Sequence, residues 1–265
     1  MLLYGDPKVG KSYAAIQLAL TLTGAGPSSW FGFPVQQNGR VVYVQLDTPR
    51  SLWAERLEAL KASGHPIDAL DLADRETLGT WPFDILNPDH EQLLRSSLAV
   101  LKPSAVIIDT LKESNSAEEN DNTAMTGAIN KLISVTQPAA LILVHHAKKP
   151  GEWGQDTIND SRGAGTTVGK MDAICRMSKK GVHFVGRGIE EGSLKLYRGD
   201  DGFWYEEESD QRADELVWSV LGDPTLSSDR ERARILAPLL GKTEEAARSA
   251  IRRYRASHPD PSPKN

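Results

Sequence analysis

The sequence predicts an α/β fold: a mostly parallel β-sheet with antiparallel strands at one edge and a small helical appendage. Apolar runs at 41–46, 105–108 and 140–144 alternate with segments of helical spacing, the pattern of a parallel sheet covered by helices. The run at 105–108 is almost continuously apolar, as a strand buried on both faces must be. Short strands separated by glycine-rich turns follow near residue 180, and they predict the antiparallel edge.

The N-terminal part supplies the expected core elements in order. Leu2–Tyr4 predicts a strand, and apolar residues at helical spacing from Ala14 to Leu22 predict a helix that ends at Gly24. A helix is expected after Pro49, whereas residues 68–90 are mixed, with Trp81-Pro82-Phe83 suggesting a short strand or a loop. The remaining core elements are a helix at 89–101, the strand at 105–108, a helix at 122–136 and the strand at 140–144.

The C-terminal part predicts edge strands and then helices. The strands are expected at 182–185, 194–197 and 202–205, and a helix near 210–221 leads to a Gly-Asp-Pro linker. Ser227-Ser228-Asp229 can cap a helix carrying Ile235, Leu236, Leu239 and Leu240, and a second helix begins after Gly241. We therefore expect a core at 1–222, a helix-turn-helix-like or winged-helix module at 223–257 and a disordered tail at 258–265.

Composition excludes several classes of protein. The 265-residue chain is 39% hydrophobic and 25% charged, which is typical of globular proteins and unlike collagen-like, disulfide-rich or disordered chains. The sequence shows no secretory signal pattern and no apolar stretch near the ~20 residues that span a bilayer. Cys175 is the single cysteine, so an internal disulfide and a zinc site built from cysteines are excluded. We expect Cys175 to be a small buried residue in a reducing, cytoplasmic setting.

Charge is unevenly distributed along the chain. The net charge of −5 argues against a uniformly basic nucleic-acid coat. Residues 229–265 carry nine Lys/Arg against five Asp/Glu, whereas the rest of the chain carries 22 against 31. A mildly basic tail on an acidic body predicts two modules, with any contact to nucleic acid confined to loops and the tail.

The strongest motif is Gly5-Asp-Pro-Lys-Val-Gly-Lys-Ser12, which matches G-x-x-x-x-G-K-[ST]. Glycines let the backbone N–H groups of a strand-to-helix loop wrap a phosphate, and the following helix N-terminus adds partial positive charge. Lys11 can reach the β- and γ-phosphates and the Ser12 hydroxyl can ligate Mg²⁺. The motif predicts a nucleoside-triphosphate site built from Gly5, Asp6, Pro7, Lys8, Val9, Gly10, Lys11, Ser12 and Tyr13. Only four residues precede Gly5, so we expect further sequence ahead of it.

Polar residues follow the other buried strands at the edge where parallel sheets bind ligands. Asp47, Asp109 and the pair His145-His146 each end a strand, so we expect them to converge on the phosphate loop. We expect Asp109 to be a Mg²⁺ ligand that acts together with Ser12. The alternative is that Asp109 only starts a turn. Thr110 follows Asp109 where many ATPases have an acidic residue, so another group must activate the attacking water.

The chain resembles the RepA-type plasmid and phage replicative helicases of the RecA-like ATPase superfamily over roughly residues 1–178. The resemblance is carried by the segments 5–12, 45–50 with 55–57, 107–111 with 118–120, and 144–147. It implies a RecA-like P-loop core, ATP and Mg²⁺ as ligands, a ring (a hexamer) with nucleotide between subunits, and single-stranded DNA as partner.

The resemblance also implies roles for individual residues. Asp47 lies where the family commonly has a glutamate that acts on water, so it is the candidate catalytic carboxylate; the alternative is a turn-capping role. His145 and His146 match a histidine pair at the end of the sensor strand. Because adjacent strand residues point to opposite faces, we expect one to sense nucleotide and the other to be structural. A metal site at the pair is disfavoured, because nothing nearby completes one.

DNA-binding residues are expected in a long glycine-rich loop, 148–167, and in the last helix. The loop corresponds to the channel-facing loop of RecA-like rings, and its cations and aromatic suit phosphates and bases; the alternative is a solvated loop. The acidic segment 113–121 counts against general DNA binding by the body. In the last helix the arginines form either a solvated face or a DNA reader. The candidates are Lys148, Lys149, Trp153, Arg162, Arg248, Arg252 and Arg253.

Ring ATPases often use an arginine or lysine from the neighbouring subunit to stabilise phosphate charge, and the sequence does not assign this residue. Arg162, Lys170, Arg176 and Arg187 are candidates, but the position that the family uses is occupied by Asp172. We therefore carry three hypotheses: a helicase motor on single-stranded DNA in replication, a recombination or replication-initiation ATPase that does not unwind, and a nearly inactive nucleotide-binding switch with a DNA-binding tail.

Overall fold

The computed structural model divides into two compact units, Met1–Glu206 and Glu207–Asn265. The boundary lies earlier than the 222/223 position expected from sequence, because the helix at 210–221 packs its Val217 and Val220 into the core of the second unit. The structure describes residues 1–35, 38–79, 82–118, 121–146, 169–206, 210–223, 225–240 and 244–257. Among them, no helix combines the length and the apolar character needed to cross a membrane.

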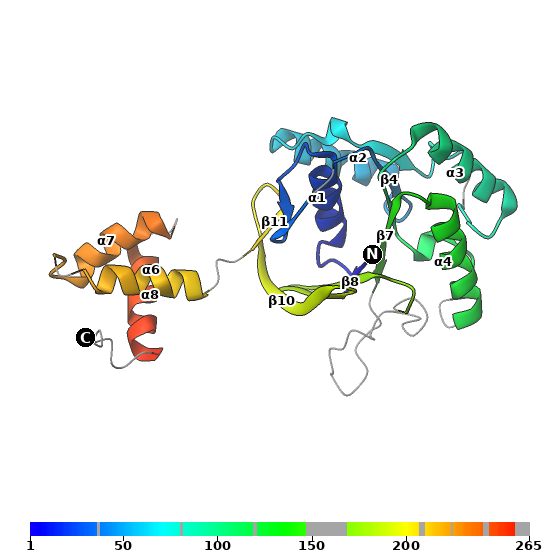
Figure 1. Cartoon of the computed structure of the whole chain (residues 1–265). Coiled ribbons are helices and arrows are strands. Elements are labelled where there is room, and N and C mark those ends of the chain that lie inside the picture. Colours follow the sequence, from blue (N-terminus) through cyan, green and yellow to red (C-terminus); the bar gives the residue numbers. More distant parts are fainter. Residues whose placement is uncertain are drawn as a thin grey trace. The chain divides into compact units, whose positions relative to one another are not determined.

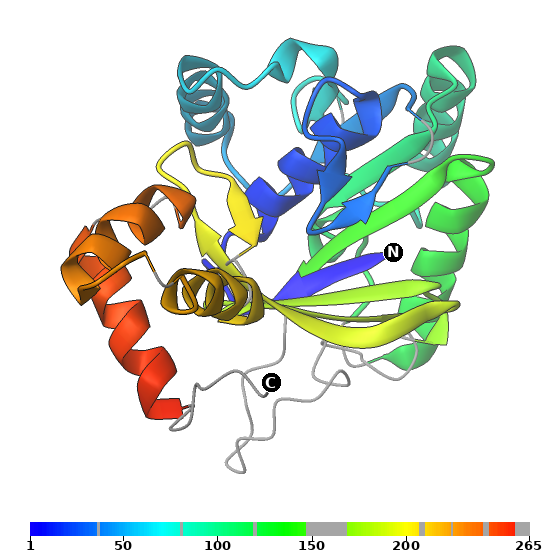
Figure 2. The same ribbon diagram turned by 60° about the vertical axis from the view of Figure 1, so that its left-hand side comes forward.

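The first unit is built on one large mixed sheet (Figures 1 and 2). In its described part nine strands lie in the order β11-β10-β9-β8-β1-β7-β6-β4-β5. Neighbours from β8 to β5 are parallel, and the strands from β8 to β11 pair antiparallel. The bounds are β1 Leu2–Gly5, β4 Val41–Gln45, β5 Asp71–Asp74, β6 Ala105–Asp109, β7 Ala140–His146, β8 Ala173–Ser178, β9 Gly181–Gly186, β10 Ile189–Arg198 and β11 Trp204–Glu206. The predicted fold class is confirmed.

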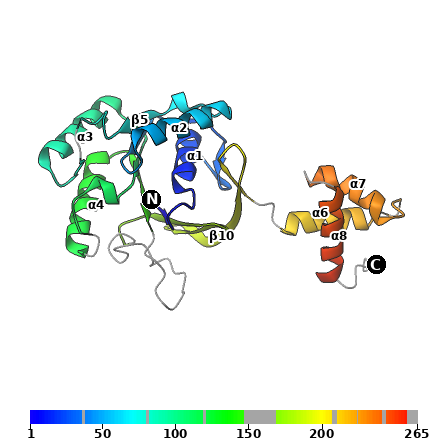
Figure 3. The same ribbon diagram turned by 180° about the vertical axis from the view of Figure 1, so that it is seen from behind.

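Helices cover both faces of this sheet, as Figure 3 shows from behind. On one face α1 packs against Tyr43 and Ile107, and on the other α3 and α4 pack against Val106 and Ile108. This layering explains why the central strands are apolar on both faces. The bounds are α1 Lys11–Thr23, α2 Arg50–Ala62, α3 Pro88–Leu101 and α4 Asn122–Thr136, with short 3₁₀ turns at Ile67–Ala69 and Lys112–Ser114 and a small hairpin of β2 Ser29–Trp30 and β3 Phe33–Pro34.

Two strands of the sheet were not expected from sequence. β5 is only half-buried and carries an aspartate at each end, so it lacks the apolar run of a central strand. β8 pairs in parallel with β1 and brings Cys175 opposite Leu3. Cys175 is buried, and burial raises the pKa of its thiol to about 12, which confirms it as an inert interior residue.

The second unit contains three helices in its described residues: α6 Asp210–Leu221, α7 Asp229–Leu239 and α8 Glu244–Ser257. The predicted cap of α7 is confirmed, because the Ser228 side chain accepts from the Glu231 N–H and Glu231 accepts from the Ser228 N–H. Leu236 and Leu240 enter the core, whereas Ile235 and Leu239 are exposed, contrary to the expected apolar face. The described residues of this unit contain no strand, so they provide no wing for the winged-helix expectation.

Candidate functional site

Strand register brings the chemistry-bearing strand ends together. β1, β7, β6 and β4 are consecutive neighbours in the sheet. Gly5 of β1 pairs with His146 of β7, and Asp109 of β6 pairs with Gln45 of β4. Since all these strands run in the same direction, their carboxyl ends form one edge, as the sequence predicts.

The phosphate loop connects β1 to α1 and has the backbone of an anion cradle. Lys8 and Gly10 have φ angles of 66° and 86°, in the left-handed region, and α1 begins at Lys11. Alternating backbone of this kind turns successive N–H groups toward one point. Gly5 is required for another reason: a Cβ there would lie 2.2 Å from the carbonyl oxygen of Met177 in β8.

Lys11 is buried at the centre of the loop. Its Nζ donates to the carbonyl oxygens of Gly5 and Asp6 at 2.9 and 2.8 Å and lies 3.4 Å from Nδ1 of His146. Burial lowers the pKa of Lys11 to about 8, although the carboxylates of Asp109, Asp6 and Asp47 oppose this shift. The ammonium group is therefore poorly compensated, and an anionic phosphate would stabilise its charged form.

Asp109 is a buried carboxylate fixed by two hydroxyl groups. The Tyr43 hydroxyl donates to Oδ2 at 2.7 Å, and Ser12 of the phosphate loop also hydrogen-bonds to Asp109. Burial raises the pKa of Asp109 above its ordinary value, while the bonds from Tyr43 and Ser12 oppose the shift. Charge at Asp109 thus depends on local donors, and a cation beside it would be strongly favoured.

The same edge contains two buried oxygen atoms whose lack of a hydrogen-bond partner indicates a site for a polar ligand. Within the described part of the chain, Oε1 of Gln45 and Oγ1 of Thr110 have no hydrogen-bond partner. These residues end β4 and follow β6, next to Asp109. Buried polar atoms are ordinarily satisfied, so hydrated Mg²⁺ and phosphate fit this edge. The described residues contain no cluster of three acidic, His or Cys ligands, but Mg²⁺ usually takes one or two protein ligands besides phosphate oxygens and water.

Asp47 is exposed where β4 ends, and its backbone is held by Arg75. Nε of Arg75 donates to the carbonyl oxygen of Leu46, Nη2 donates to that of Asp47 at 3.2 Å, and Nη2 lies 3.7 Å from a carboxylate oxygen of Glu113. The pKa of Asp109, which burial raises, is raised further by the charge of Asp47, so the two carboxyl groups lie within electrostatic reach. Arg75 therefore connects the ends of β4, β5 and β6.

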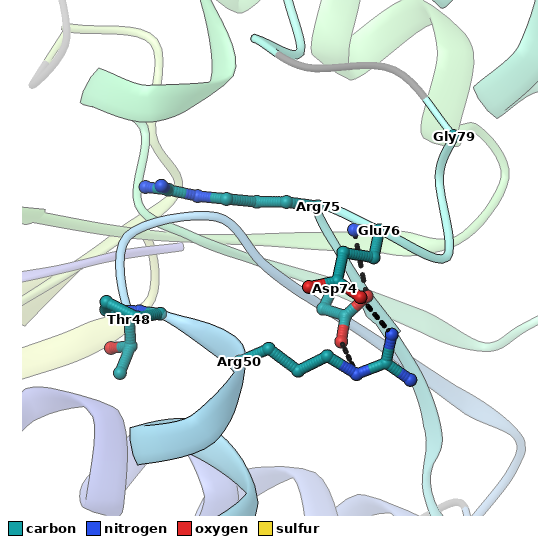
Figure 4. A pocket seen from close by; sticks show the side chains of 7 residues that line it. Thr48, Arg50, Asp74, Arg75, Glu76 and Gly79 are labelled. Atoms are coloured by element: carbon teal, nitrogen blue, oxygen red, sulfur yellow. Dashed lines mark hydrogen bonds and ion pairs between the residues drawn. The ribbon is translucent and has the colours of Figure 1, made fainter.

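A pocket of about 540 Å³ is lined by the segment that directly follows Asp47 (Figure 4). Arg50 points toward Asp74 and Glu76 on one side, with its Nε 3.5 Å from Asp74, while Arg75 extends toward the other. The lining residues are Thr48, Pro49, Arg50, Asp74, Arg75, Glu76 and Gly79. The residues that directly follow Asp47 thus line an accessible space.

The two histidines occupy opposite faces of β7, as predicted from the alternation of strand side chains. His146 is half-buried and contacts Lys11. Val144 packs in the core on the α1 side of the sheet. The next residue, His145, is fully buried and therefore lies on the opposite side, which α4 covers. Of the two, His146 is the one that contacts Lys11 of the phosphate loop.

Comparison with known proteins agrees with this geometry. Residues 1–152 match the protein family described as an AAA domain. The chain belongs to the AAA domain family. This AAA domain is a P-loop ATPase by family, which accounts for the phosphate loop, the buried lysine and the strand-end aspartate. No curated protein matches the chain.

The predicted DNA-binding residues belong to the second compact unit or lie outside the described residues. Lys148, Lys149, Trp153 and Arg162 lie outside them, as does the side chain of Arg253. On α8 of the AAA protein, Arg248 and Arg252 are exposed, and Arg248 lies 3.7 Å from Glu244. Arg255 of the same helix donates through both Nη atoms to the carboxylate of Asp229 in α7. Among candidate trans-acting cations, Arg187 pairs with Asp172 at 3.1 Å.

Sequence reasoning missed three residues at this site: Tyr43, Arg75 and Trp204. Tyr43 could have been found from alternation, since it shares a face with Gln45, which pairs with Asp109. Arg75 follows β5, and that strand has no apolar signature. Trp204 contacts the phosphate loop from the far edge of the sheet, and no local pattern predicts such a contact.

Proposed function

We propose that this AAA domain binds and hydrolyses ATP with Mg²⁺ at the carboxyl ends of β1, β4, β6 and β7. The observation that supports this proposal best is the convergence of Lys11, Asp109 and Asp47. The charges of Asp109 and Asp47 oppose the lowering of the Lys11 pKa by burial, and the charge of Asp47 raises the pKa of Asp109, although the three residues come from three different strand ends. Phosphoryl transfer needs positioning and charge stabilisation more than covalent chemistry, and this edge offers both.

Lys11 is the group that binds the β- and γ-phosphates. Its present bonds to the carbonyl oxygens of Gly5 and Asp6 keep the loop ordered, and phosphate oxygens replace these acceptors when nucleotide enters. Ser12 and Asp109 are the residues that would hold Mg²⁺, which neutralises phosphate charge when bound. Tyr43 keeps the Asp109 carboxylate oriented toward Ser12.

Asp47 orients and deprotonates the attacking water. It is exposed, and the next residue, Thr48, lines the pocket in Figure 4. Arg75 fixes the backbone of Asp47 by donating to the carbonyl oxygens of Leu46 and Asp47. His146 contacts Lys11 and reports the presence of the γ-phosphate to the end of β7. Removal of the Asp47 carboxylate is expected to spare binding and stop turnover.

The work driven by hydrolysis is proposed to be movement on single-stranded DNA by a hexameric ring in replication. The order and spacing of the motifs shared with RepA-type helicases support this proposal, as does the loop at 148–167 with its cations and tryptophan. The competing hypothesis is an ATPase for recombination or initiation that does not unwind. The carboxylate partners of Arg248 and Arg255 favour it, because they reduce the positive charge that α8 presents to DNA.

One set of assays tests these proposals. ATP turnover is measured with and without single-stranded DNA, and oligomeric state is recorded by light scattering in the same buffer. DNA-stimulated turnover by a hexamer, together with strand displacement on a forked duplex, supports the motor. Stimulated turnover without displacement favours the non-unwinding ATPase. ATP binding without turnover in either condition leaves the nearly inactive switch.

A further inference from the structure

The hairpin of β10 and β11 contacts the phosphate loop, although it lies outside residues 1–152 that match the AAA domain. β11 runs beside α1 at the edge of the unit, and both Figure 1 and Figure 2 show this arrangement. The sequence pattern predicts these strands only as an extension of the sheet. Their contacts with the loop therefore need a separate explanation.

Trp204 of β11 fills the space that a side chain at position 10 would occupy. A Cβ on Gly10 would lie 2.9 Å from Cζ2 and from Nε1 of the indole ring. Nε1 also lies 3.4 Å from the carbonyl oxygen of Gly10, to which it donates a long hydrogen bond. The buried indole therefore packs directly against the phosphate loop at Gly10, the residue that precedes Lys11.

Gln17 fixes the backbone of Trp204 relative to α1. Its Nε2 donates to the Trp204 carbonyl oxygen at 2.8 Å, and the Trp204 N–H donates to its Oε1 at 3.0 Å. Both residues are buried, so this amide pair is protected from water. Because Lys11 and Gln17 belong to the same helix, the indole is held at a fixed position relative to the loop.

The tip of the hairpin is anchored as well. The Arg198 guanidinium lies 3.8 Å from the ring centroid of Tyr13, the residue after Ser12. Phe203 stacks on His65, with ring centroids 3.7 Å apart, in the turn after α2. These contacts hold the hairpin against two helices, so Trp204 has little freedom to move away from Gly10.

We propose that Trp204 is a positioning residue of the phosphate loop, which holds the Gly10 peptide in the conformation that receives the phosphates of ATP. The inference rests on the proposed function. The loop N–H groups converge on phosphate only while Gly10 keeps its left-handed backbone. Loosening that peptide weakens nucleotide binding and leaves Asp47, which acts on water, unchanged. Substitution of Trp204 should therefore raise KM and Kd for ATP and leave kcat nearly unchanged.

The test compares Trp204→Phe with Trp218→Phe in the full-length chain. Trp218 is a half-exposed tryptophan of the helical unit and serves as the matched control. Losing the hydrogen bond from the indole Nε1 predicts a roughly two- to tenfold rise in Kd and KM for ATP in Trp204→Phe, with kcat within about twofold. Trp204→Tyr, which keeps a donor on the ring, is a second variant should the first fail to fold. Calorimetry gives Kd, and the thermal midpoint confirms folding.

Intrinsic fluorescence adds a readout that needs no substitution. Saturating ATP should change the tryptophan emission of the wild type and of Trp218→Phe, and most of this change should vanish in Trp204→Phe. Unaltered Kd and KM in a folded Trp204 variant, or a fluorescence change that survives without Trp204, overturns this inference alone. A wild-type chain that binds no ATP would overturn the proposed function together with it.

Discussion

The charged side chains at the strand ends of the first unit and those on α8 of the helical unit differ in their exposure to water. In Met1–Glu206 the central charges, Lys11 and Asp109, are 5% and 1% exposed, and hydroxyl or carbonyl groups surround them. In the helical unit Arg248 and Arg255 lie at the surface and pair with nearby carboxylates. Water screens the second kind of charge and not the first, so chemistry is expected where charge is buried.

The largest effect is expected for Lys11→Ala. This substitution removes the cation that faces the phosphates and should lower ATP turnover by roughly 10²- to 10³-fold or more. Coupled-assay ATPase rates measure the loss. Lys61→Ala, which removes an exposed lysine paired with Asp68, is the matched control and should turn over normally. Comparable losses in both variants would show that burial does not distinguish the two charges.

The pH dependence of ATP binding should report Lys11 directly. Burial lowers its pKa to about 8 in the nucleotide-free protein, and bound phosphate restores the charged form. Above about pH 8 the complex holds a proton that the free protein has lost, so affinity should fall by up to tenfold per pH unit. Below that pH this group should cause no change. Calorimetry between about pH 7 and about pH 10 measures the slope, which Lys11→Met should lack.

A smaller effect is expected for Tyr43→Phe. It deletes the donor to a buried carboxylate and should cost about 1.5–3 kcal/mol in the free energy of unfolding, measured with urea. Because the Tyr43 bond opposes the burial that raises the pKa of Asp109, its loss should raise that pKa further and weaken Mg²⁺ binding. Tyr197→Phe, on an exposed ring, serves as control. Equal stability of both variants would contradict the role given to Tyr43.

The smallest effect is expected for Arg255→Ala. Both partners of its pair with Asp229 are more than two-fifths exposed, so the loss should be about 0–1 kcal/mol and should shrink as salt is added. Urea titrations at low and high ionic strength measure it. A loss of stability comparable with that of Tyr43→Phe would contradict the expected difference between exposed charges in the helical unit and buried charges in the ATPase unit.

The sequence predicts the features that depend on local pattern. The apolar runs give β4, β6 and β7, and the phosphate-loop motif and strand-ending aspartates give the main site residues. Features that depend on neighbours in space are not predictable in this way. β5 has half-buried residues and two aspartates, and β8 is recognised only by its pairing with β1. Trp204 reaches Gly10 from the opposite end of the unit's sequence, so no spacing could indicate it.

The most direct test of the site as a whole is ATP binding and single-turnover hydrolysis by Asp47→Asn beside the wild type. A water-activating carboxylate contributes about 10²–10⁴-fold, so hydrolysis should fall at least about 10²-fold while Kd for ATP stays within about threefold. Asp47→Glu, which introduces the residue common in RepA-type helicases, should keep turnover. Hydrolysis at the wild-type rate by Asp47→Asn would contradict the assignment of the water-activating group.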